Sequence, residues 1–324
     1  DTLTDYAAHL LGLVDLKAIR PLKVVVDAGN GMGGHTVPTV FEGLPLDLVP
    51  MYFDLDGTFP NHEANPLDPK NIVDLQARVV AEGADLGLAF DGDADRCFVV
   101  DERGEGVSPS AITALVAARE LARNGGEGTV IHNLITSWSV PEVVRENGGT
   151  AVRTRVGHSF IKTEMAKHGA IFGGEHSAHY YFRDFWNADT GMLAALHVLA
   201  ALGGQTAPLS ELVAQYDRYT GSGDTTAVVV STNVGILENV CSFADTIARD
   251  TVLGLSPLGL PQTSSNVIAG SVALAHGLRG PNVTLCNGPT SGLDALYWAR
   301  ALIVTGRADT AVVIGVEPTG DIVT

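Results

Sequence analysis

Short apolar runs alternate with longer amphipathic segments through the first 225 residues of the chain. The apolar runs predict strands at residues 23–27, 85–90, 128–132, 151–155 and 170–172. Apolar residues at helical spacing predict helices at residues 71–81, 111–122, 140–146, 161–168 and 192–202. Such alternation indicates parallel sheets covered by helices on both faces, so we expect an α/β fold of two units that divide near residues 106–110.

Charge density falls sharply after residue 225. Residues 1–225 carry 16 Lys and Arg and 30 Asp and Glu, whereas residues 226–324 carry 4 and 7. A change of this kind often marks a domain boundary, and the run of small residues at 220–224 suits a joint. We therefore expect three domains, at residues 1–106, 107–225 and 226–324.

The composition is typical of a globular, cytoplasmic protein. Hydrophobic residues make up 45% and charged residues 18% of the 324 positions, and no apolar run is long enough to cross a membrane. The net charge of −17 argues against a nucleic-acid partner held on a basic face. Cys97, Cys241 and Cys286 are too scattered for a disulfide framework or a thiolate zinc cluster, which indicates a reducing compartment. Because the first methionine is Met32, we expect the chain to be a piece of a longer protein.

Three carboxylates alternate in the turn after the apolar run 86–90, at Asp91, Asp93 and Asp95. Acidic groups this close repel one another unless a cation lies between them, and Mg²⁺ prefers such oxygen ligands. The alternative is a solvated acidic turn that closes a hairpin into the apolar run 97–100. Spacing alone does not decide between the two interpretations.

A glycine pattern follows the first predicted strand. Gly29, Gly31 and Gly34 match the G-x-G-x-x-G fingerprint of dinucleotide-binding proteins, and Asp47 and Asp54 are available as the downstream acidic residue. The segment after this pattern contains a proline and would make a poor phosphate-binding helix. A tight strand-to-helix turn is therefore favoured over a dinucleotide site.

Two further polar segments have more than one interpretation. Residues 54–58 are similar to the nucleophile motif of haloacid-dehalogenase-type phosphatases, with Asp54 as nucleophile, but a polar surface loop is favoured. The segment with Glu175, His176, Ser177 and His179 lacks the H-E-x-x-H spacing of a zinc helix. A loop with a carboxylate, a hydroxyl and an imidazole suits sugar hydroxyls, although simple loop polarity is the alternative.

The acidic turn 91–96 and the loop 174–179, with segment 156–162 between them, together resemble the α-D-phosphohexomutase family, most closely bacterial phosphomannomutase/phosphoglucomutase. Members of that family carry a D-G-D-[AGF]-D-R metal loop and a G-E-x-S-G-H sugar loop, and similar motifs recur here in that order. Segments 27–33 and 56–62 also look like the family's second domain. The resemblance covers about residues 1–225 and implies two α/β domains with mixed sheets, similar to domains 2 and 3 of the family.

The resemblance also implies an activity and a cofactor. In the family, a phosphoserine beside Mg²⁺ exchanges its phosphoryl group with a hexose phosphate, so the implied reaction is Mg²⁺-dependent intramolecular phosphoryl transfer on mannose or glucose 1- or 6-phosphate. Carried over by motif position, the Mg²⁺ ligands would be Asp91, Asp93 and Asp95, and Arg96 would contact phosphate.

The same motifs imply a sugar site. Glu175, Ser177 and His179 would hold the sugar hydroxyls, and His158 would face the reacting oxygen to position it or handle its proton.

The chain departs from the family's pattern in several places. Ala178 takes the place of a glycine, which is a mild change unless the backbone there needs a positive φ. Trp138 and Asn187 take the places of arginines. No T-A-S-H-N-P-like phosphoserine segment is present, and nothing after residue 225 resembles the family's fourth domain. We therefore expect the chain to be inactive by itself, which leaves open whether it is an enzyme.

Residues 226–324 are similar to part of a β-ketoacyl synthase of the thiolase fold, through segments 260–284, 292–304 and 308–317. The turn that would carry the nucleophilic cysteine has Pro289 in its place, and Cys286 comes too early, so thioester chemistry is not expected. The alternative function is a non-catalytic, chain-length-factor-like interaction module of fatty acid or polyketide synthesis that dimerises through this tail. Two unrelated partial likenesses suggest a fusion or a chimera.

Overall fold

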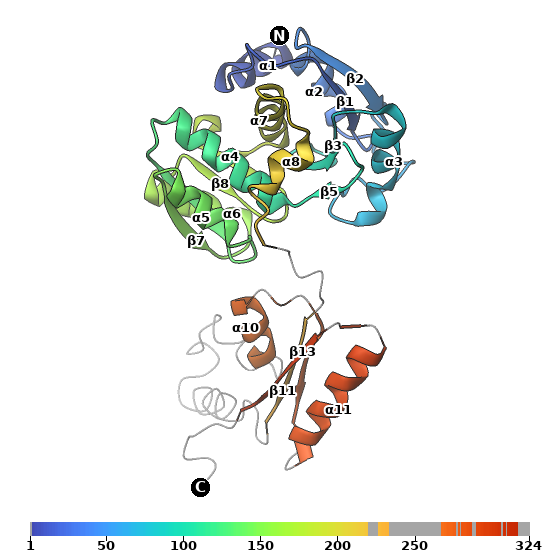
Figure 1. Cartoon of the computed structure of the whole chain (residues 1–324), viewed down its shortest axis with the longest axis vertical. Coiled ribbons are helices and arrows are strands. Elements are labelled where there is room, and N and C mark those ends of the chain that lie inside the picture. Colours follow the sequence, from blue (N-terminus) through green and yellow to red (C-terminus); the bar gives the residue numbers. More distant parts are fainter. Residues whose placement is uncertain are drawn as a thin grey trace, which may run out of the picture. The chain divides into compact units, whose positions relative to one another are not determined.

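The computed structural model describes residues 2–219, 226–232, 267–276, 278, 280–286, 290–305, 307–308 and 310–316. The chain divides into two compact units, residues 1–219 and 220–324, and each unit is described separately (Figure 1). The first unit contains two five-stranded sheets, and the second contains a three-stranded sheet. The joint expected at 220–224 lies outside the described residues, as do Cys241 and Pro289.

The first sheet is mixed and has the strand order β2-β1-β3-β4-β5. β1 pairs in parallel with β2 and β3, whereas β4 and β5 continue the sheet in antiparallel fashion. Its strands are β1 (Leu22–Asp27), β2 (Leu46–Met51), β3 (Leu86–Phe90), β4 (Cys97–Asp101) and β5 (Gly106–Val107). Its helices are α1 (Thr2–Leu13), α2 (Gly33–Val40), the 3-10 helix η1 (Pro69–Asn71) and α3 (Val73–Glu82).

The second sheet repeats this plan with the order β10-β9-β8-β6-β7. β6 pairs in parallel with β7 and β8, and β9 and β10 are antiparallel. The strands are β6 (Thr129–Asn133), β7 (Thr150–Thr154), β8 (Phe172–Gly174), β9 (Tyr180–Phe182) and β10 (Ala188–Asp189). The helices are α4 (Pro109–Arg123), α5 (Ser139–Glu146), α6 (His158–His168), η2 (Arg183–Phe185), α7 (Gly191–Gly203) and α8 (Leu209–Ala214).

The parallel pairing expected from strand–helix alternation is present in β2-β1-β3 and β7-β6-β8, the remaining strands are antiparallel, and the mixed sheets implied by the family resemblance are confirmed. A run such as 86–90 is apolar because β3 is buried on both faces, but burial does not reveal the direction of the next strand. The turn 91–96 is too short for a crossover helix, so β4 must return antiparallel.

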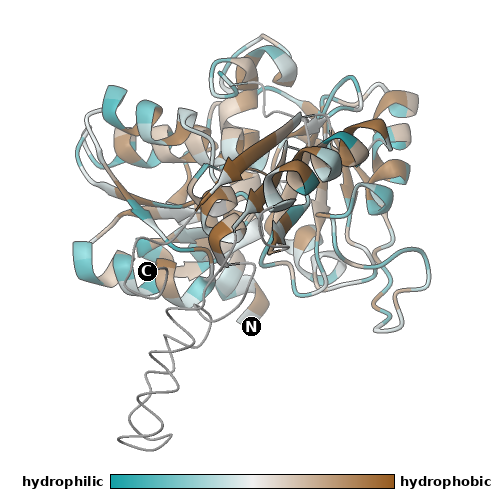
Figure 2. Ribbon diagram, turned by 90° about the horizontal axis from the view of Figure 1, so that it is seen from below, coloured by the Kyte–Doolittle hydropathy of each residue, from teal (hydrophilic) through white to brown (hydrophobic). Residues whose placement is uncertain are grey.

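Helix α7 explains the most apolar segment of the first unit. It is buried along almost its whole length and contacts both α4 and β4. Its side chains belong to the same hydrophobic core as β1, β3 and β8, so the two sheets of this unit share one core. In Figure 2 the strands are mostly brown, and the helices carry both brown and teal residues.

The second unit is a small three-layer sandwich with the strand order β12-β11-β13, all parallel. Helix α11 packs on one face of β11 through Ala295, Ala299 and Leu302, and α10 packs on the other face. The ketosynthase-like segment 292–304 forms most of α11. The elements are β11 (Thr226–Ser231), α10 (Val267–His276), β12 (Asn282–Leu285), α11 (Ser291–Val304) and β13 (Thr310–Gly315). Among the described helices, none has the length and apolar character needed to span a membrane.

The glycine turn after β1 packs directly against the acidic turn after β3. The Met32 N–H donates to Gly92 O at 2.9 Å, and a Cβ on Gly31 would lie 2.5 Å from that oxygen. The glycine at position 31 is therefore required by a close backbone approach, which supports the strand-to-helix turn favoured from sequence.

We expect Gly31→Ala to lower the free energy of unfolding by about 1–3 kcal/mol, because the added methyl group must push the two turns apart. Gly12→Ala in α1 is the matched control, since a Cβ there meets nothing within 4 Å and alanine should stabilise the helix by about 0.5–1 kcal/mol. Urea denaturation of both variants measures the effect. Equal stability of the two variants would contradict the close approach.

Candidate active site

The β3–β4 hairpin presents the three carboxylates predicted as metal ligands. Phe90 and Cys97 are paired across the hairpin, so residues 91–96 form its turn. Asp91, Asp93 and Asp95 each offer an oxygen within 4.8 Å of the others. The segment is thus a hairpin turn and an acidic cluster at once, because the turn that reverses the chain also brings the three carboxylates together.

Arg96 pairs closely with one of these carboxylates and at longer range with a second. Its backbone N donates to Asp91 Oδ1 at 3.1 Å, and its Nε donates to Asp91 Oδ2 at 2.7 Å. The same Nε lies 4.0 Å from Asp95 Oδ1. Burial, and then the charges of Asp91 and Asp93, raise the pKa of Asp95 to about 7. The cluster sets three carboxylates against one guanidinium and offers hard oxygen donors, so these residues fit a divalent cation such as Mg²⁺.

Glu175 lies at the end of β8 and is held by three donors from different elements. Asn133 Nδ2 and the Gly157 N–H donate to its Oε1 at 3.0 and 3.1 Å, and the Tyr181 hydroxyl donates to its Oε2 at 2.8 Å. Gly157 has φ +126°, a backbone conformation that favours glycine and aims its N–H at the carboxylate. Glu175 is therefore a buried carboxylate that is held in one orientation as a hydrogen-bond acceptor.

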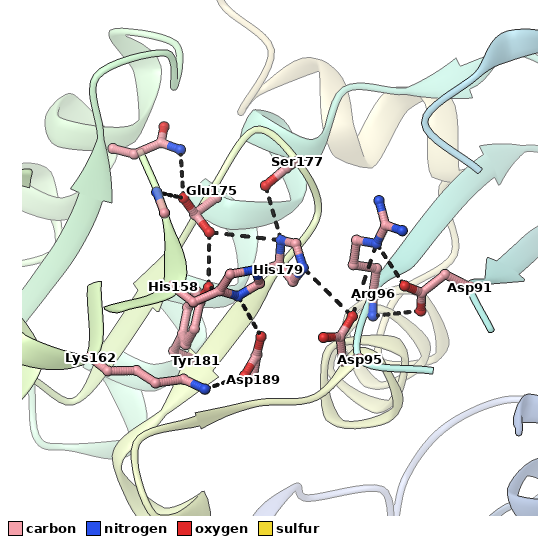
Figure 3. A network of polar contacts seen from close by, with 12 residues as sticks. Asp91, Asp95, Arg96, His158, Lys162, Glu175, Ser177, His179, Tyr181 and Asp189 are labelled. Carbon is pink, nitrogen blue, oxygen red and sulfur yellow. Dashed lines mark hydrogen bonds and ion pairs between the residues drawn. The ribbon is translucent and has the colours of Figure 1, made fainter. Parts of the chain in front are cut away.

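His179 links this loop to the acidic turn (Figure 3). Its Nε2 lies 3.6 Å from Asp95 Oδ1, its Nδ1 lies 3.0 Å from Ser177 Oγ, and its backbone forms a bridge with Arg96. The ring of His158, at the start of α6, contacts the His179 ring edge to face with centroids 4.3 Å apart. Burial, followed by the charge of His158, lowers the pKa of His179. All eight residues predicted for the site are thus brought together around two adjoining loops.

Sequence reasoning missed Asp189 and Lys162 as members of the site. Asp189, in β10, accepts from Lys162 Nζ at 2.9 Å and lies 3.3 Å from His158 Nδ1. Burial alone would raise the pKa of Asp189, but the hydrogen bond and charge of Lys162 and the charge of His179 lower it. Lys162 lies within segment 156–162, so its contribution was detectable, whereas Asp189 stands outside every recognised motif.

A second group of missed residues lies in the loop after β2. Asn65 Oδ1 accepts from Arg96 Nη1 at 3.2 Å, opposite the contact that Arg96 makes with Asp91. The loop is attached to β1 by His62 Nε2, 3.0 Å from Asp27 Oδ2. A Cβ on Gly92 would be in ordinary van der Waals contact with side chains of this loop. The loop after β2 therefore packs against the acidic turn and holds Arg96 in place.

The motif at residues 54–58 lies in the same loop. The backbone and hydroxyl of Thr58 both donate to Asp56 Oδ1, and the Asp54 carbonyl accepts from Asn30 Nδ2. These contacts form a polar surface turn, as favoured from sequence.

The three substitutions relative to the family pattern have different consequences. Ala178 has φ +67°, so this position is left-handed and alanine carries strain there of about 1–2 kcal/mol. Trp138 is 63% exposed, and Arg153 of β7 lies over its ring. Asn187 has φ +55°, and its Oδ1 is buried without a hydrogen-bond partner among the described residues. Because its backbone has a positive φ, the change from glycine to Ala178 is not mild.

Protonation of His62 is expected to stabilise the fold. Burial lowers the pKa of His62, but the Glu63 carbonyl and Asp27 outweigh it and raise that pKa above its ordinary value. The stabilisation is therefore complete below the unfolded-state pKa of about 6.5 and is lost as pH rises through the higher folded-state pKa. The pKa of Asp27 is also raised, mainly by burial, so its contribution has the same sign.

Urea denaturation across this pH range measures the effect. The advantage in stability of the wild type over His62→Gln should shrink as pH rises. Parallel profiles for the two proteins would contradict it.

Comparison with known proteins divides the chain in a similar way. The family model described as phosphoglucomutase/phosphomannomutase, alpha/beta/alpha domain II, matches residues 4–104, and the model of domain III matches residues 108–219. The model described as beta-ketoacyl synthase, N-terminal domain, matches residues 212–322. The exact boundaries expected from sequence, at 106 and 225, stay predictions.

The chain is similar to several curated relatives. Phosphomannomutase of Escherichia coli (strain K12) is 42% identical over 213 residues, which cover 64% of this chain and 46% of that protein. A protein of Xanthomonas campestris pv. campestris named phosphohexose mutases is 38% identical over 244 residues, covering 75% of this chain and 54% of that protein. The chain thus spans about half the length of these relatives.

A solved structure shows the same fold. The crystal structure of a phosphoglucomutase/phosphomannomutase family protein from Burkholderia thailandensis matches with a TM-score of 0.65 and 33% identity, covering 75% of this chain and 51% of that one. Over residues 4–219, the chain therefore belongs to the phosphoglucomutase/phosphomannomutase family, as its domains II and III, and this part is followed by a segment similar to the N-terminal domain of β-ketoacyl synthases.

Proposed function

We propose that residues 4–219 form the Mg²⁺- and hexose-binding part of a phosphohexomutase that transfers a phosphoryl group between positions of a mannose or glucose phosphate. One observation carries the proposal. The acidic turn of the first sheet and the polar loop of the second meet where His179 Nε2 lies 3.6 Å from Asp95 Oδ1. Oxygen donors for a cation and polar groups for sugar hydroxyls therefore adjoin in one site.

The acidic turn is suited to the charged end of such a substrate. Asp91, Asp93 and Asp95 would hold Mg²⁺, which when bound supplies positive charge that stabilises a transferring phosphoryl group. Arg96 has its Nε on Asp91 and its Nη1 on Asn65, so its guanidinium is held in one orientation beside the acidic turn. A fixed guanidinium is well suited to bind phosphate oxygens.

The polar loop is suited to the sugar. Glu175 would accept from hydroxyl groups, and Ser177 and His179 would donate or accept beside it. His158 Nδ1 faces Asp189 and the Tyr181 hydroxyl, at 3.3 and 3.0 Å. These partners favour a proton on Nδ1, so His158 Nε2 would be the nitrogen that takes a proton from a reacting hydroxyl.

Calorimetric titration of glucose 1,6-bisphosphate into the chain, with Mg²⁺ and again with a chelator, tests the proposal. Binding is the appropriate measurement, because the 324 residues contain no T-A-S-H-N-P-like segment and we expect no turnover from them alone. Saturable, Mg²⁺-dependent binding is the expected result. Absence of binding in both conditions would overturn the proposal.

Asn65 is expected to act as a positioning residue for Arg96. Asn65→Leu removes the acceptor at 3.2 Å and should weaken glucose bisphosphate binding by about 10-fold, the effect of losing about 1.4 kcal/mol. Affinity for Mg²⁺ should stay within about two-fold, because Asn65 contacts no member of the acidic cluster directly. Asn65→Asp keeps an acceptor for Arg96 and should restore most of the affinity. Equal losses in both variants would contradict the positioning role.

An observation on the second unit favours a second function for the tail. Leu293, Leu296, Tyr297 and Val304 lie on one side of α11 and are 58–73% exposed, while the opposite side packs on the sheet. We propose that this side pairs with α11 of a second copy of the chain, which suits a non-catalytic ketosynthase-like interaction module. Sedimentation should show a concentration-dependent dimer that Tyr297→Asp abolishes. A monomer at all concentrations would contradict this.

A further inference from the structure

Two imidazoles and one carboxylate converge beside the acidic turn, and they form a different kind of donor set. His158, Glu175 and His179 each offer an atom within 4.8 Å of the others. The acidic turn provides oxygen only, which suits Mg²⁺, whereas two histidines with one glutamate suit Zn²⁺. We propose that His158, Glu175 and His179 form a binding site for Zn²⁺ or a similar borderline metal ion, distinct from the proposed Mg²⁺ site.

The three donors come from two places, the loop after β8 and the start of α6, and they are fixed to different degrees. Glu175 and His179 are buried, at 2% and 9% exposure, and Glu175 already has three hydrogen-bond donors that orient it. The side chain of His158 is 53% exposed, so it is the movable ligand and solvent reaches the site beside it. Ligand atoms around a tetrahedral zinc ion lie about 3.4 Å apart, and His158 is the ligand that would adjust to this spacing.

The surrounding groups favour a bound cation. Asp189 and Asp95 lie close to the histidines, and His179, Asp95 and Asp189 form a second set within 4.8 Å. Lys162 and Arg96 are the nearby cations, and they are paired with Asp189 and Asp91.

Glu175 and His179 are also proposed sugar ligands, and His158 is the proposed proton acceptor, which gives the site a consequence. A zinc ion held by them would occupy the groups intended for hexose hydroxyls, so Zn²⁺ should compete with the sugar and not with Mg²⁺. Only this competition rests on the proposed function, because zinc binding itself needs no sugar.

The test is titration of Zn²⁺ into the chain at saturating Mg²⁺. We expect one site that His158→Gln and His179→Gln each weaken by about 10-fold or more, as for loss of one of three ligands. His168→Gln is the matched control, because His168 is another partly exposed histidine of α6 beside a glutamate, Glu164, and its loss should have no effect. Asp93→Asn should also leave Zn²⁺ affinity unchanged.

Co²⁺ provides a spectroscopic readout. Bound Co²⁺ should show the intense visible absorption of four-coordinate cobalt, and His158→Gln should remove it although this exposed substitution leaves the fold intact. Loss of zinc binding in Asp93→Asn but not in His158→Gln would overturn the inference, because zinc would then occupy the acidic turn. Zinc binding that glucose 1,6-bisphosphate does not weaken would leave the metal site standing and contradict only the shared use of the residues.

Discussion

Asp93→Asn is expected to weaken Mg²⁺ binding by about 100-fold or more, which corresponds to about 2.7 kcal/mol. Asp91 is engaged by the backbone and side chain of Arg96, so Asp93 and Asp95 carry most of the uncompensated negative charge of the turn. Two unit charges 4 Å apart interact by about 4 kcal/mol at an effective dielectric of about 20, so removal of one ligand charge accounts for the loss. Mg²⁺-dependent binding of glucose 1,6-bisphosphate should disappear with it.

The same substitution should not damage the fold. Asp93 is exposed at the tip of the turn, and its charge helps to raise the pKa of Asp95. Without Mg²⁺, Asp93→Asn should therefore be as stable as the wild type or slightly more stable, because repulsion in the turn decreases. Asp47→Asn, which removes an exposed carboxylate from β2, is the matched control and should leave Mg²⁺ affinity unchanged. Equal affinity of the two variants for Mg²⁺, measured by calorimetry, would show that the turn is not the metal site.

Glu175→Ala is expected to lower the free energy of unfolding by about 3 kcal/mol and to abolish hexose binding. The substitution leaves Asn133 Nδ2, the Gly157 N–H and the Tyr181 hydroxyl without their acceptor. Each buried donor that loses its partner costs about 1–3 kcal/mol, reduced where water can enter. Glu164→Ala on the surface of α6 is the control and should cost less than about 1 kcal/mol.

Glu175→Gln separates the two effects. The amide oxygen can still accept from Asn133 and Gly157, and the NH₂ group can donate to the Tyr181 hydroxyl oxygen, which leaves only the donor of that hydroxyl without its former acceptor. Stability should therefore fall by only about 1 kcal/mol, while sugar affinity falls by about 10-fold because the charge is lost. If Gln destabilised the protein as much as Ala does, Glu175 would have a structural role alone.

Several elements were predictable because their signals are local. The strand at 85–90 and the helix at 111–122 agree with β3 and α4 to within a few residues, since burial on both faces or helical periodicity shows in consecutive positions. β2 and β9 were missed. β2 is an edge strand that is only partly buried, and β9 has three residues, so neither produces a clear periodic signal.

The site was predictable to the extent that its residues are neighbours in sequence. Asp91, Asp93 and Asp95 lie in one turn, and Glu175, Ser177 and His179 lie in one loop, so motif and chemistry could be recognised together. Asn65 and Asp189 contribute through contacts with residues distant in the chain, and no local pattern distinguishes them from ordinary polar surface residues.

Sequence alone was sufficient for the α/β class, the two polar loops and the likeness to phosphohexomutases, because these depend on periodicity and on short runs of residues. The tertiary structure decided the rest. It showed which strands run antiparallel, that Ala178 is left-handed, and that the two loops meet at Asp95 and His179. The physical reason is that strand direction, backbone strain and the desolvation that raises the pKa of Asp95 depend on what packs around a residue, and those neighbours come from other parts of the chain.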